Sequence, residues 1–389
     1  MDFRVVDDLA HYRDQAREWV DKNVNPDWVE EQKSTGTYHT QQLHKQLADE
    51  GYLGAGWPKE YGGSDVDPDL ARTLFQEIYR TGMHMDGWAT TEMVAHTVLH
   101  TGTEEQKKRF VGGALAGDII IVLGYTEPDN GSDAAAAKCK AERDGDEWII
   151  NGTKMFTSTA HVGTHVFLLT RSNWDVPKHK GLTMFLTEMN KPGFDCQPVH
   201  TLGGQRTNAT FYSDFRIPDA DRIGDAEGGW GVMKVALVYE RGGSLGASGP
   251  TLPERFAAWA QSSTMDDGSL VYDNPLVKEK LARIAIDVEI AKLLGSKVAW
   301  VSKTGGLPGV EGSMAKLFGP EAAQRHYSDL LDLLGPEAVL QPHAEGAPLD
   351  GSIEHAFRNA VVATVYGGSS EIMREIIAER RLGLPRARP

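Results

Sequence analysis

Apolar residues recur at helical spacing along the first 120 residues. In the segment 43–50 two leucines lie one helical turn apart, and Gly51 follows as a helix stop. From about residue 121 the chain changes to short runs rich in β-branched residues, which predict strands. After residues 228–230 the helical spacing returns and continues to the C-terminus. The pattern therefore predicts a helical region, a β region and a second helical region.

Turn-forming residues divide the β region into separate strands. The runs that predict strands are 119–123, 147–150, 166–169 and 182–186. The turn signals among them are Asp144-Gly145, Asn151-Gly152 and Lys191-Pro192-Gly193. Short strands with glycine turns are typical of a small antiparallel barrel or sandwich. We expect three domains, all-α over 1–120, β over 121–229 and all-α over 230–389.

Composition and charge narrow the function. A chain of 389 residues divides into two or three domains and can bury a sizeable core. Its 40 Lys and Arg residues against 55 Asp and Glu residues give a net charge of −15, which disfavours nucleic acid or an anionic membrane as a partner. No apolar run approaches membrane-spanning length and residues 1–4 lack a signal pattern, so we expect a soluble, cytoplasmic protein.

Cysteine and histidine form no recognisable metal or disulfide pattern. Cys139 and Cys196 are too few for a disulfide framework and form no CxxC motif, so a reducing compartment fits best. The 13 histidines show no HExxH spacing. We therefore expect no metal site.

Four segments resemble one enzyme family, in the order in which that family has them. They are 54–63 (GAGWPKEYGG), 125–133 (YTEPDNGSD), 151–158 (NGTKMFTS) and 366–374 (YGGSSEIMR). Through them the chain is similar to the flavin-dependent acyl-CoA dehydrogenases, from about residue 40 to the C-terminus. The resemblance implies an α+β multidomain fold with a helical N-terminal domain, a middle antiparallel β-barrel or sandwich and a C-terminal four-helix bundle. It also implies FAD as the cofactor and an acyl-CoA thioester as the substrate.

The resemblance also implies a role for individual residues. In the family, the segment like 125–133 lines the flavin and the start of the acyl thioester, and the segment like 151–158 places a hydroxyl against the flavin ring. The residues implied for cofactor binding are Leu123, Tyr125, Thr126, Gly131, Ser132, Phe156, Ser158, Ser369 and Glu371. Those implied for substrate binding are Ser132, Arg241 and Gly367.

Plainer explanations stand beside several of these assignments. The stretch 128–132 also fits an ordinary turn. Phe156 and Ser158 also fit an edge-strand pair without a ligand. Trp57 fits a core position better than a cofactor contact, because aromatic residues dominate cores by area. The stretch 203–208 resembles a hairpin of the family, which either bears on coenzyme A or simply turns the chain.

The catalytic base is the central question for such a reaction. Removal of a proton alpha to a thioester needs a carboxylate in a dry pocket, where desolvation raises its basicity. Many family members carry that glutamate where this chain has Gly367. In a subset the glutamate lies at the position that resembles Glu240, and the C-terminal position is small. The resemblance thus implies Glu240 as the base, and the backbone N–H of Gly367 remains a donor to the thioester carbonyl.

Glu240 and its neighbours also have structural explanations. We expect Glu240-Arg241 to begin the long helix after the β region, where a charged pair complements the helix dipole without any catalytic role. Gly242 and Gly243 follow directly, and glycine costs about 1 kcal/mol against alanine within a helix. They either leave space for a bulky acyl group or accommodate the local backbone.

Two departures from the family pattern bear on assembly. Many members have an arginine that reaches the flavin pyrophosphate of a neighbouring subunit, but the corresponding stretch 264–270 has none, and no arginine lies between Arg255 and Arg283. Leu334-Gly335-Pro336 replaces the double glycine that meets the adenine half. In the family, these losses occur together in a bacterial subgroup that includes two-chain complexes acting on steroid side chains. We expect a homotetramer or an α2β2 heterotetramer with a second acyl-CoA dehydrogenase-like chain.

The resemblance implies α,β-desaturation to a trans-2-enoyl-CoA. Glu240 removes the alpha proton, the flavin takes hydride from the beta carbon, and an electron-transfer flavoprotein receives the electrons. Two other functions remain open. The chain fits an acyl-CoA oxidase-type flavoenzyme, which would react with oxygen, and it fits a non-catalytic partner subunit that completes the flavin site of another chain.

Overall fold

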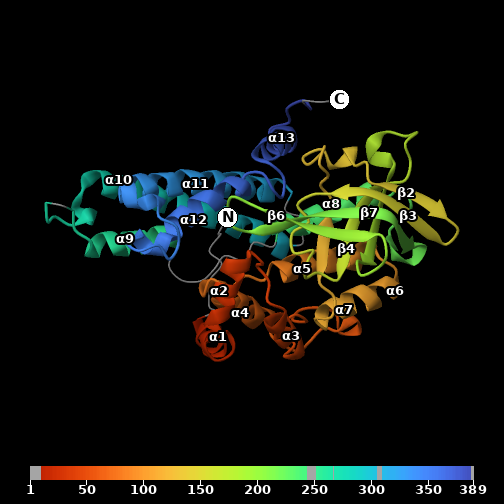
Figure 1. The fold of residues 1–389 in the computed structure, drawn as a ribbon, viewed down its shortest axis with the longest axis horizontal. Helices are drawn as coiled ribbons and strands as arrows, with labels where there is room; N and C mark the ends of the chain where they lie inside the picture. The colour runs from red at the N-terminus through yellow and green to blue at the C-terminus, as the bar shows by residue number, and fades with distance from the viewer. Residues whose placement is uncertain (1–9, 243–250, 266, 305–308, 387–389) are drawn as a thin grey trace. The chain divides into compact units, whose positions relative to one another are not determined.

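The chain folds into two compact units, each with its own hydrophobic core (Figure 1). The computed structural model describes residues 10–242, 251–265, 267–304 and 309–386. The described residues from 10 to 242 form the larger unit, and those from 251 onward form the smaller unit.

Helices form the first part of the larger unit. Their bounds are α1 Ala10–Asn23, α2 Pro26–Thr35, α3 Gln41–Asp49, α4 Pro68–Arg80, α5 Asp86–Thr101, α6 Glu104–Gln106 and α7 Gly112–Leu115, with a π-helical turn Lys107–Val111 between the last two. The Asn25 side chain accepts the Asp27 N–H at 3.0 Å and so caps α2. Gly51 adopts φ +82° directly after α3, which confirms the predicted helix stop.

The strands of the larger unit form one sheet. Their bounds are β1 Ile121–Gly124, β2 Lys140–Asp144, β3 Glu147–Lys154, β4 His165–Arg171, β5 Leu182–Glu188, β6 Phe194–His200, β7 Arg206–Pro218 and β8 Arg222–Ile223. Their spatial order is β6-β7-β3-β2-β4-β5-β8, and β1 pairs with β4. The four predicted strand runs fall on β1, β3, β4 and β5, so the predicted β region is confirmed.

The sheet is mixed, whereas the sequence predicted an antiparallel one. β1 pairs with β4 in parallel, with Val122 opposite Val166, and β2 meets β4 in parallel where Lys140 lies opposite Arg171. No pairing among the described strands closes the sheet into a barrel. Every position of β4 from 166 to 171 is buried, which is typical of a strand covered on both faces. The apolar run predicted the strand, but the direction of its partner depends on the path of the chain.

The predicted turns have different outcomes. Asp144-Gly145 lies in the β2–β3 hairpin and Gly193 in the turn before β6, both glycines with positive φ, as predicted. Asn151-Gly152 is not a turn, because both residues lie within β3, where the register to β7 shifts between Ile150 and Gly152. A β-carbon at Gly152 would lie 2.8 Å from the Cα of Cys139, so this glycine permits a close approach between strands.

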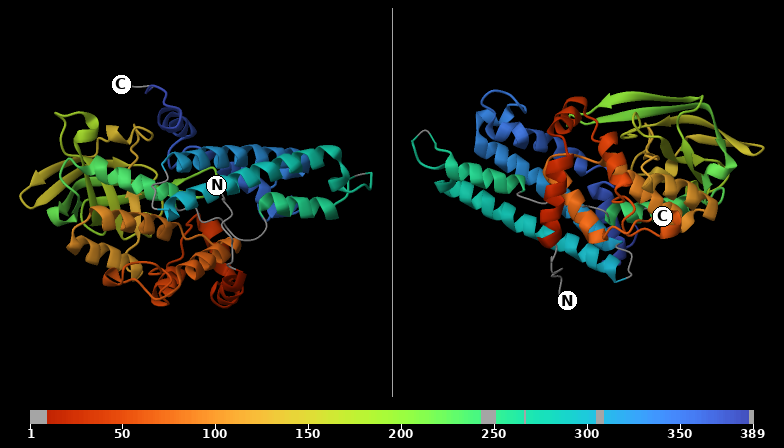
Figure 2. Two further views of the ribbon diagram at one scale, coloured as in Figure 1. Left: turned by 180° about the vertical axis from the view of Figure 1, so that it is seen from behind. Right: turned by 90° about the horizontal axis from the view of Figure 1, so that it is seen from below.

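The helices α5 and α8 Gly229–Gly242 lie side by side against the sheet (Figure 2). The Thr91 hydroxyl accepts the Ile121 N–H at 2.8 Å, which fastens α5 to β1. A β-carbon at Gly229 would lie 2.8 Å from the Leu182 carbonyl oxygen, so α8 begins in backbone contact with β5. Because α8 packs against α5 and β5, it belongs to the larger unit. The domain boundaries at residues 120 and 229 stay predictions.

The smaller unit is helical, as predicted for the C-terminal region. Its helices are α9 Leu252–Ser262, α10 Pro275–Lys303, α11 Val310–Leu334, α12 Ser352–Ala363 and α13 Ser370–Arg380. Phe256, Ile284 and Leu330 are almost fully buried between α9, α10 and α11. The nearly buried His326 of α11 lies 3.0 Å from the Asp287 carboxylate of α10, which joins these two helices by a polar contact.

Candidate active site

A buried ion pair fixes the loop that carries most of the predicted cofactor residues. Lys154 ends β3 with a fully buried side chain, and its Nζ lies 2.7 Å from Oε1 of Glu127. The same ammonium donates to the Tyr125 carbonyl oxygen at 3.1 Å. A buried ammonium is tolerated only when it is paired and hydrogen-bonded. The pair therefore holds residues 125–127 against the end of β3.

The carboxylate of Glu127 also accepts hydrogen bonds from the other end of the loop. It accepts the backbone N–H groups of Lys138 at 2.7 Å and Cys139 at 2.8 Å, and the Asn130 side-chain amide at 3.1 Å. Burial favours a raised pKa for Glu127, but Lys154 and these N–H donors outweigh it, and the pKa is lowered. Glu127 is thus an anion at neutral pH.

Arg171 supports the same loop from β4. Its guanidinium is nearly buried and donates to the carbonyl oxygens of Ala135 at 2.6 Å, Ala137 at 2.8 Å and Lys178 at 2.9 Å. Five donors in a rigid fork allow one side chain to satisfy several carbonyls. Arg171 and Glu127 together account for the shape of the loop, and the sequence analysis assigned no role to either or to Lys154.

The segment after β3 runs beside this loop. The Met155 N–H donates to the Thr126 carbonyl oxygen at 2.9 Å. Phe156 follows with φ +58° and is 58% exposed, an unusual conformation and exposure for an aromatic residue. Phe156 and Ser158 lie beyond the end of β3, so they are not the edge-strand pair that the sequence left open.

Hydrogen bonds to β7 hold this segment in place. The Thr157 N–H donates to the Asn208 carbonyl oxygen at 2.9 Å, and the Asn208 amide donates to the Thr157 carbonyl oxygen at 3.0 Å. The Ser158 hydroxyl lies 3.0 Å from the Thr207 hydroxyl. The stretch 203–208 includes the β6–β7 hairpin and the first residues of β7, as expected. Through Thr207 and Asn208 it supports the segment 155–158.

The other loop residues fall in two places. Glu127 and Asn130 exchange two backbone hydrogen bonds around Pro128 and Asp129, which makes a tight turn. Gly131 and Ser132 follow it and are both exposed, and Gly131 does not have a positive φ. The ordinary-turn explanation therefore describes 127–130 well and leaves the role of Gly131 and Ser132 as a prediction. Leu123 is half-buried within β1.

Glu240 lies in the last described turn of α8. The expectation that it begins this helix is wrong, because α8 begins at Gly229, where the chain first meets β5. An acidic residue so far from the N-terminus of a helix gains nothing from the dipole, so that structural explanation does not apply. Glu240 follows the buried residues Val232 and Ala236 at helical spacing and thus extends the buried face of α8.

Tyr125 connects the loop with Glu240. Burial raises the pKa of the Tyr125 phenol well above its ordinary value, and the negative charge of Glu240 raises it further. The hydroxyl has no hydrogen-bond partner within the described part of the chain. The carboxylate of Glu240 and a protonated, buried hydroxyl donor therefore lie within electrostatic reach of each other. The side chains of Arg241 and Gly242, and all of Gly243, lie outside the description.

Aromatic rings fill the space between α8 and α5. The ring of Trp57 stacks on His96 with centroids 4.0 Å apart, and His96 stacks on Tyr239 at 4.9 Å. The His100 ring nitrogen lies 2.5 Å from the Tyr239 hydroxyl. Trp57 is 7% exposed and belongs to the core, as the sequence indicated. These contacts fix the turn of α8 that carries Glu240.

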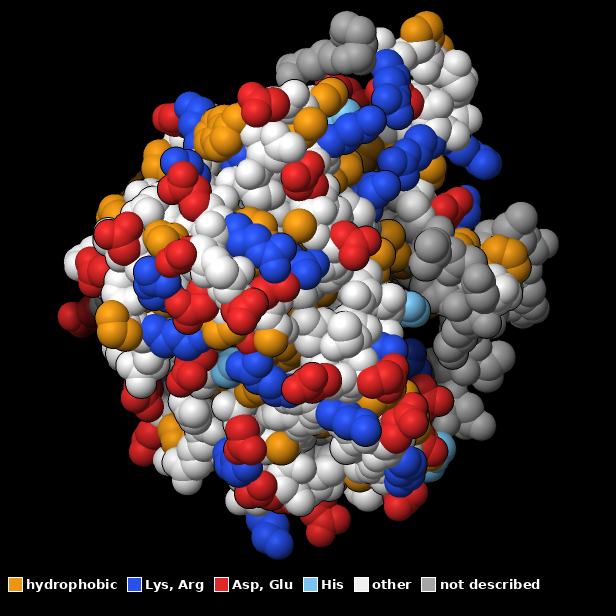
Figure 3. Space-filling model, turned by 90° about the vertical axis from the view of Figure 1, so that its right-hand side faces the viewer, with side chains coloured by type: hydrophobic (Ala, Val, Ile, Leu, Met, Phe, Trp, Pro, Cys, Tyr) orange, Lys and Arg blue, Asp and Glu red, His pale blue; other side chains and the backbone are white. Residues whose placement is uncertain are grey.

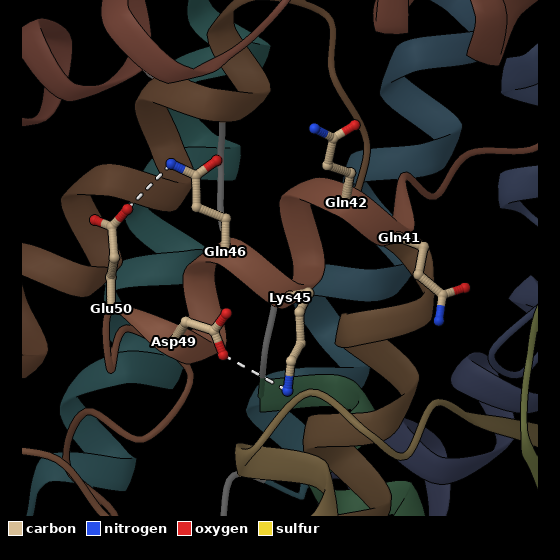
Figure 4. A pocket seen from close by; sticks show the side chains of 6 residues that line it. All are labelled: Gln41, Gln42, Lys45, Gln46, Asp49 and Glu50. Carbon is tan, nitrogen blue, oxygen red and sulfur yellow. Dashed lines mark hydrogen bonds and ion pairs between the residues drawn. The ribbon is translucent and has the colours of Figure 1, made fainter.

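The surface elsewhere in the described residues is hollowed along α3, where the lining residues are polar. This hollow is lined by Gln41, Gln42, Lys45, Gln46, Asp49 and Glu50 (Figure 4). Gln46 donates to Glu50 at 3.0 Å, and Lys45 lies 3.5 Å from Asp49. Acidic and basic side chains are interspersed over the face shown in Figure 3. Among the described residues no three His, Cys, Asp or Glu side chains form a group that could hold a metal ion. No described helix is long and apolar enough to cross a bilayer.

Comparisons with known proteins agree with the motifs. Models of the N-terminal, middle and C-terminal domains of acyl-CoA dehydrogenases match residues 7–118, 122–216 and 227–382. The chain is 35% identical over 350 residues to acyl-CoA dehydrogenase FadE26 of Mycobacterium tuberculosis, which covers 88% of this chain and 87% of that protein. The chain belongs to the acyl-CoA dehydrogenase family.

Solved structures extend the similarity over the whole acyl-CoA dehydrogenase chain. The Tcur3481-Tcur3483 steroid ACAD has a TM-score of 0.88 and 33% identity, with 100% of both chains covered. The ChsE4-ChsE5 complex from Mycobacterium tuberculosis has a TM-score of 0.85 and 32% identity, again over 100% of both chains. The family, the fold and the assignment to the oxidoreductases are thus confirmed. Members of the family are FAD flavoproteins.

The residues around the loop of this acyl-CoA dehydrogenase fit FAD. The Tyr125 hydroxyl and the Asn130 side-chain oxygen are buried polar atoms that lack a partner within the described residues. Buried polar groups normally have hydrogen-bond partners. Phe156 offers an exposed aromatic ring on the neighbouring segment, where the Met155 N–H bonds to Thr126. A planar ring system with polar edges would satisfy both kinds of group, so Tyr125, Asn130, Phe156 and Ser158 are the residues suited to hold it.

The remaining predicted site residues belong to the smaller unit. Gly367 and Gly368 have φ of +63° and +95° between α12 and α13, a conformation that suits glycine. The Ser369 hydroxyl caps α13 by accepting the Ile372 N–H at 3.4 Å. Glu371 is exposed in the first turn, where hydrogen bonds from its backbone and Ser369 lower its pKa. The roles of Gly367, Ser369 and Glu371 in substrate and cofactor binding stay predictions.

We expect Lys154→Met to destabilise the protein strongly. The substitution keeps most of the bulk but leaves the Glu127 carboxylate buried without its cation, which costs about 3–5 kcal/mol. Denaturant unfolding measures the loss. The matched control is Lys138→Met, whose lysine pairs with Asp129 at the surface and should change stability by less than about 1 kcal/mol.

The dependence of folding stability on pH gives a second measure of the ion pair between Glu127 and Lys154. Because the folded pKa of Glu127 is lowered, its stabilising contribution is present above the ordinary carboxyl pKa of about 4.3 and is lost as pH falls through the folded value. The double variant Glu127→Gln/Lys154→Met should lose this part of the acid sensitivity and be more stable than Lys154→Met alone. Equal stability of Lys154→Met and Lys138→Met would contradict the account.

Proposed function

We propose that this chain desaturates acyl-CoA thioesters between the alpha and beta carbons, with Glu240 as the base. The observation that supports the proposal is the place of Glu240 on the buried face of α8, within electrostatic reach of the Tyr125 hydroxyl. Tyr125 belongs to the loop suited to hold FAD. A carboxylate in this position would face a substrate that lies along the cofactor.

In the proposed reaction, the carboxylate of Glu240 accepts the proton from the alpha carbon. The Trp57-His96-Tyr239 stack fixes the preceding turn of α8, and a bound acyl chain would exclude water from this carboxylate and so favour proton uptake. Bound FAD supplies the acceptor for the hydride that leaves the beta carbon. The C–H bonds at both carbons are thereby broken, the proton remains on Glu240, and the product is a trans-2-enoyl-CoA.

Two further groups are proposed to stabilise the enolate-like charge. The backbone N–H of Gly367 would donate to the thioester oxygen, where preorganised donors contribute most. The Tyr125 phenol stays protonated at neutral pH, because burial and Glu240 raise its pKa, so it remains a donor beside the carboxylate. Ser132 and Arg241 are proposed as substrate contacts. An electron-transfer flavoprotein is proposed as the acceptor of the electrons.

The smaller unit supports an oligomer. The apolar residues Ile286, Ile290 and Leu293 lie along one side of α10 and are 61%, 36% and 50% exposed. Exposed apolar stripes of this kind commonly mark protein interfaces. Two similar solved structures are named as two-chain proteins, Tcur3481-Tcur3483 and ChsE4-ChsE5. We infer an α2β2 heterotetramer with a second chain of this family, with a homotetramer as the alternative.

The Glu240→Gln variant tests the base. The amide keeps the shape of the side chain but cannot accept the proton, so anaerobic flavin bleaching by acyl-CoA should slow by a factor on the order of 10³ or more. Binding of acyl-CoA should persist. Glu142→Gln, which changes an exposed carboxylate on β2, is the control and should bleach at the wild-type rate. Bleaching of Glu240→Gln at the wild-type rate would show that Glu240 is not the base.

The visible spectrum of the chain purified alone, read beside its mass in solution, tests the assembly. The proposed heterotetramer predicts a colourless chain that gains flavin absorption only with its partner, because 264–270 supplies no arginine for the FAD pyrophosphate. Flavin at near-stoichiometric occupancy in a tetramer of this chain alone would contradict the heterotetramer and favour the homotetramer.

A further inference from the structure

Two polar side chains lie on one side of α5, the helix that packs against α8. Glu92 and His96 lie one turn apart on the same side of the helix, and both are half-buried. Neither side chain makes a hydrogen bond or an ion pair with any described residue. Once an acyl group covers such polar groups they need hydrogen-bond partners, because each otherwise loses hydration that nothing replaces.

Their position relative to the candidate active site follows from the ring stack. His96 is held face to face between Trp57 and Tyr239, and the next residue after Tyr239 is Glu240. The stack leaves the edge of the His96 ring, which carries both nitrogens, as its only polar surface. Glu92 lies one turn earlier on α5, toward Tyr79 of α4. Burial and the charges of Asp86 and Glu92 raise the pKa of the Tyr79 phenol. His96 thus lies against the residue that precedes the proposed base, and Glu92 lies one helical turn away along α5, toward α4.

The chemistry of the two groups defines what they could bind. Burial raises the pKa of Glu92 to about 7, so near neutrality the carboxyl both donates and accepts hydrogen bonds. Burial and the nearby His100 lower the pKa of His96 to about 4, so its ring is neutral and offers one donor and one acceptor. No lysine or arginine in the described part of the chain forms an ion pair with Glu92. A neutral donor and acceptor pair suits an uncharged oxygen better than an ammonium or a second carboxylate.

We propose that Glu92 and His96 form a polar subsite that selects acyl groups carrying a hydroxyl or keto oxygen beyond the reacting carbons. The proposal rests on the proposed function, because it takes the acyl group to extend from Glu240 along α5. A wholly aliphatic acyl group would leave both side chains buried without partners, whereas an oxygen at this depth would satisfy them. The subsite therefore acts on specificity, while Glu240 acts on the reaction.

The test compares linear acyl-CoAs of increasing length, each paired with its terminal-hydroxyl counterpart. Dissociation constants are measured by calorimetry on the Glu240→Gln holoenzyme, assembled with its partner chain if one is required, and turnover is followed in parallel on the wild type. At the length that reaches the subsite, we expect the hydroxylated member to bind on the order of tenfold more tightly. Shorter members should show no such preference.

Variants of the two residues keep the test specific. Glu92→Leu and His96→Phe should abolish the preference, and the phenyl ring retains the stack with Trp57 and Tyr239. Glu92→Gln, which still hydrogen-bonds, should keep the preference within a few fold and serves if Glu92→Leu does not fold. Glu105→Leu, an exposed change on α6, is the matched control and should behave as the parent protein.

The outcomes separate the subsite from the proposed function. Equal or weaker binding of the hydroxylated member at every length overturns the subsite, and so does a preference that survives both Glu92→Leu and His96→Phe. If aliphatic members still bleach the flavin in that case, the proposed desaturation stands alone. If no acyl-CoA bleaches the wild-type holoenzyme while the binding preference is present, the proposed function fails and the subsite remains as a binding site.

Discussion

The buried ion pair between Glu127 and Lys154 is the interaction on which the candidate active site depends. One carboxylate joins the end of β1, the turn 127–130, the backbone at residues 138–139 and the end of β3. Such a pair contributes little net stability compared with an apolar replacement, but the loss of either partner is costly. The arrangement therefore fixes one conformation of the loop. It also holds the loop that carries Tyr125 next to the segment that carries Phe156.

Rigid support of this kind is what the proposed reaction requires. The groups that would face the substrate lie on the loop, on the segment after β3 and on α8, and hydrogen bonds or stacked rings hold each of them. Tyr239 is fixed by His96 and His100, and Glu240 is the next residue along α8. A base held by its own helix needs little reorganisation when the substrate binds. The same stack places His96 of the proposed polar subsite against the residue that precedes the proposed base. One helix contact would thus connect specificity with the reaction.

Much of the fold could be predicted from the sequence, because hydrophobic spacing reports burial directly. The order of helices, strands and helices and the Gly51 and Gly193 turns are local features, and the structure has them. The parallel pairing of β1 with β4 and the bulge at Gly152 depend on contacts between distant segments, which no local pattern contains.

The parts of the candidate site that lie in family-like motifs could be predicted from the sequence. The parts that depend on which side chains are buried could not. The segments 125–133 and 151–158 resembled the family, and the structure brings them together. Lys154 was missed because a lysine in a strand is normally exposed, and only its partner Glu127 explains its burial. The place of Glu240 in α8 was misjudged because the contact of Gly229 with β5 sets the helix start.

The central claim is that Glu240 exchanges the alpha proton of a bound acyl-CoA. Its most direct test uses an acyl-CoA whose beta carbon carries no hydrogen, incubated with the flavin-loaded protein in deuterium oxide. Because hydride transfer is blocked, mass spectrometry of the recovered thioester reports proton removal alone. The account predicts deuterium at the alpha carbon with wild-type protein and background exchange with Glu240→Gln. Equal deuterium incorporation by the two proteins would contradict it.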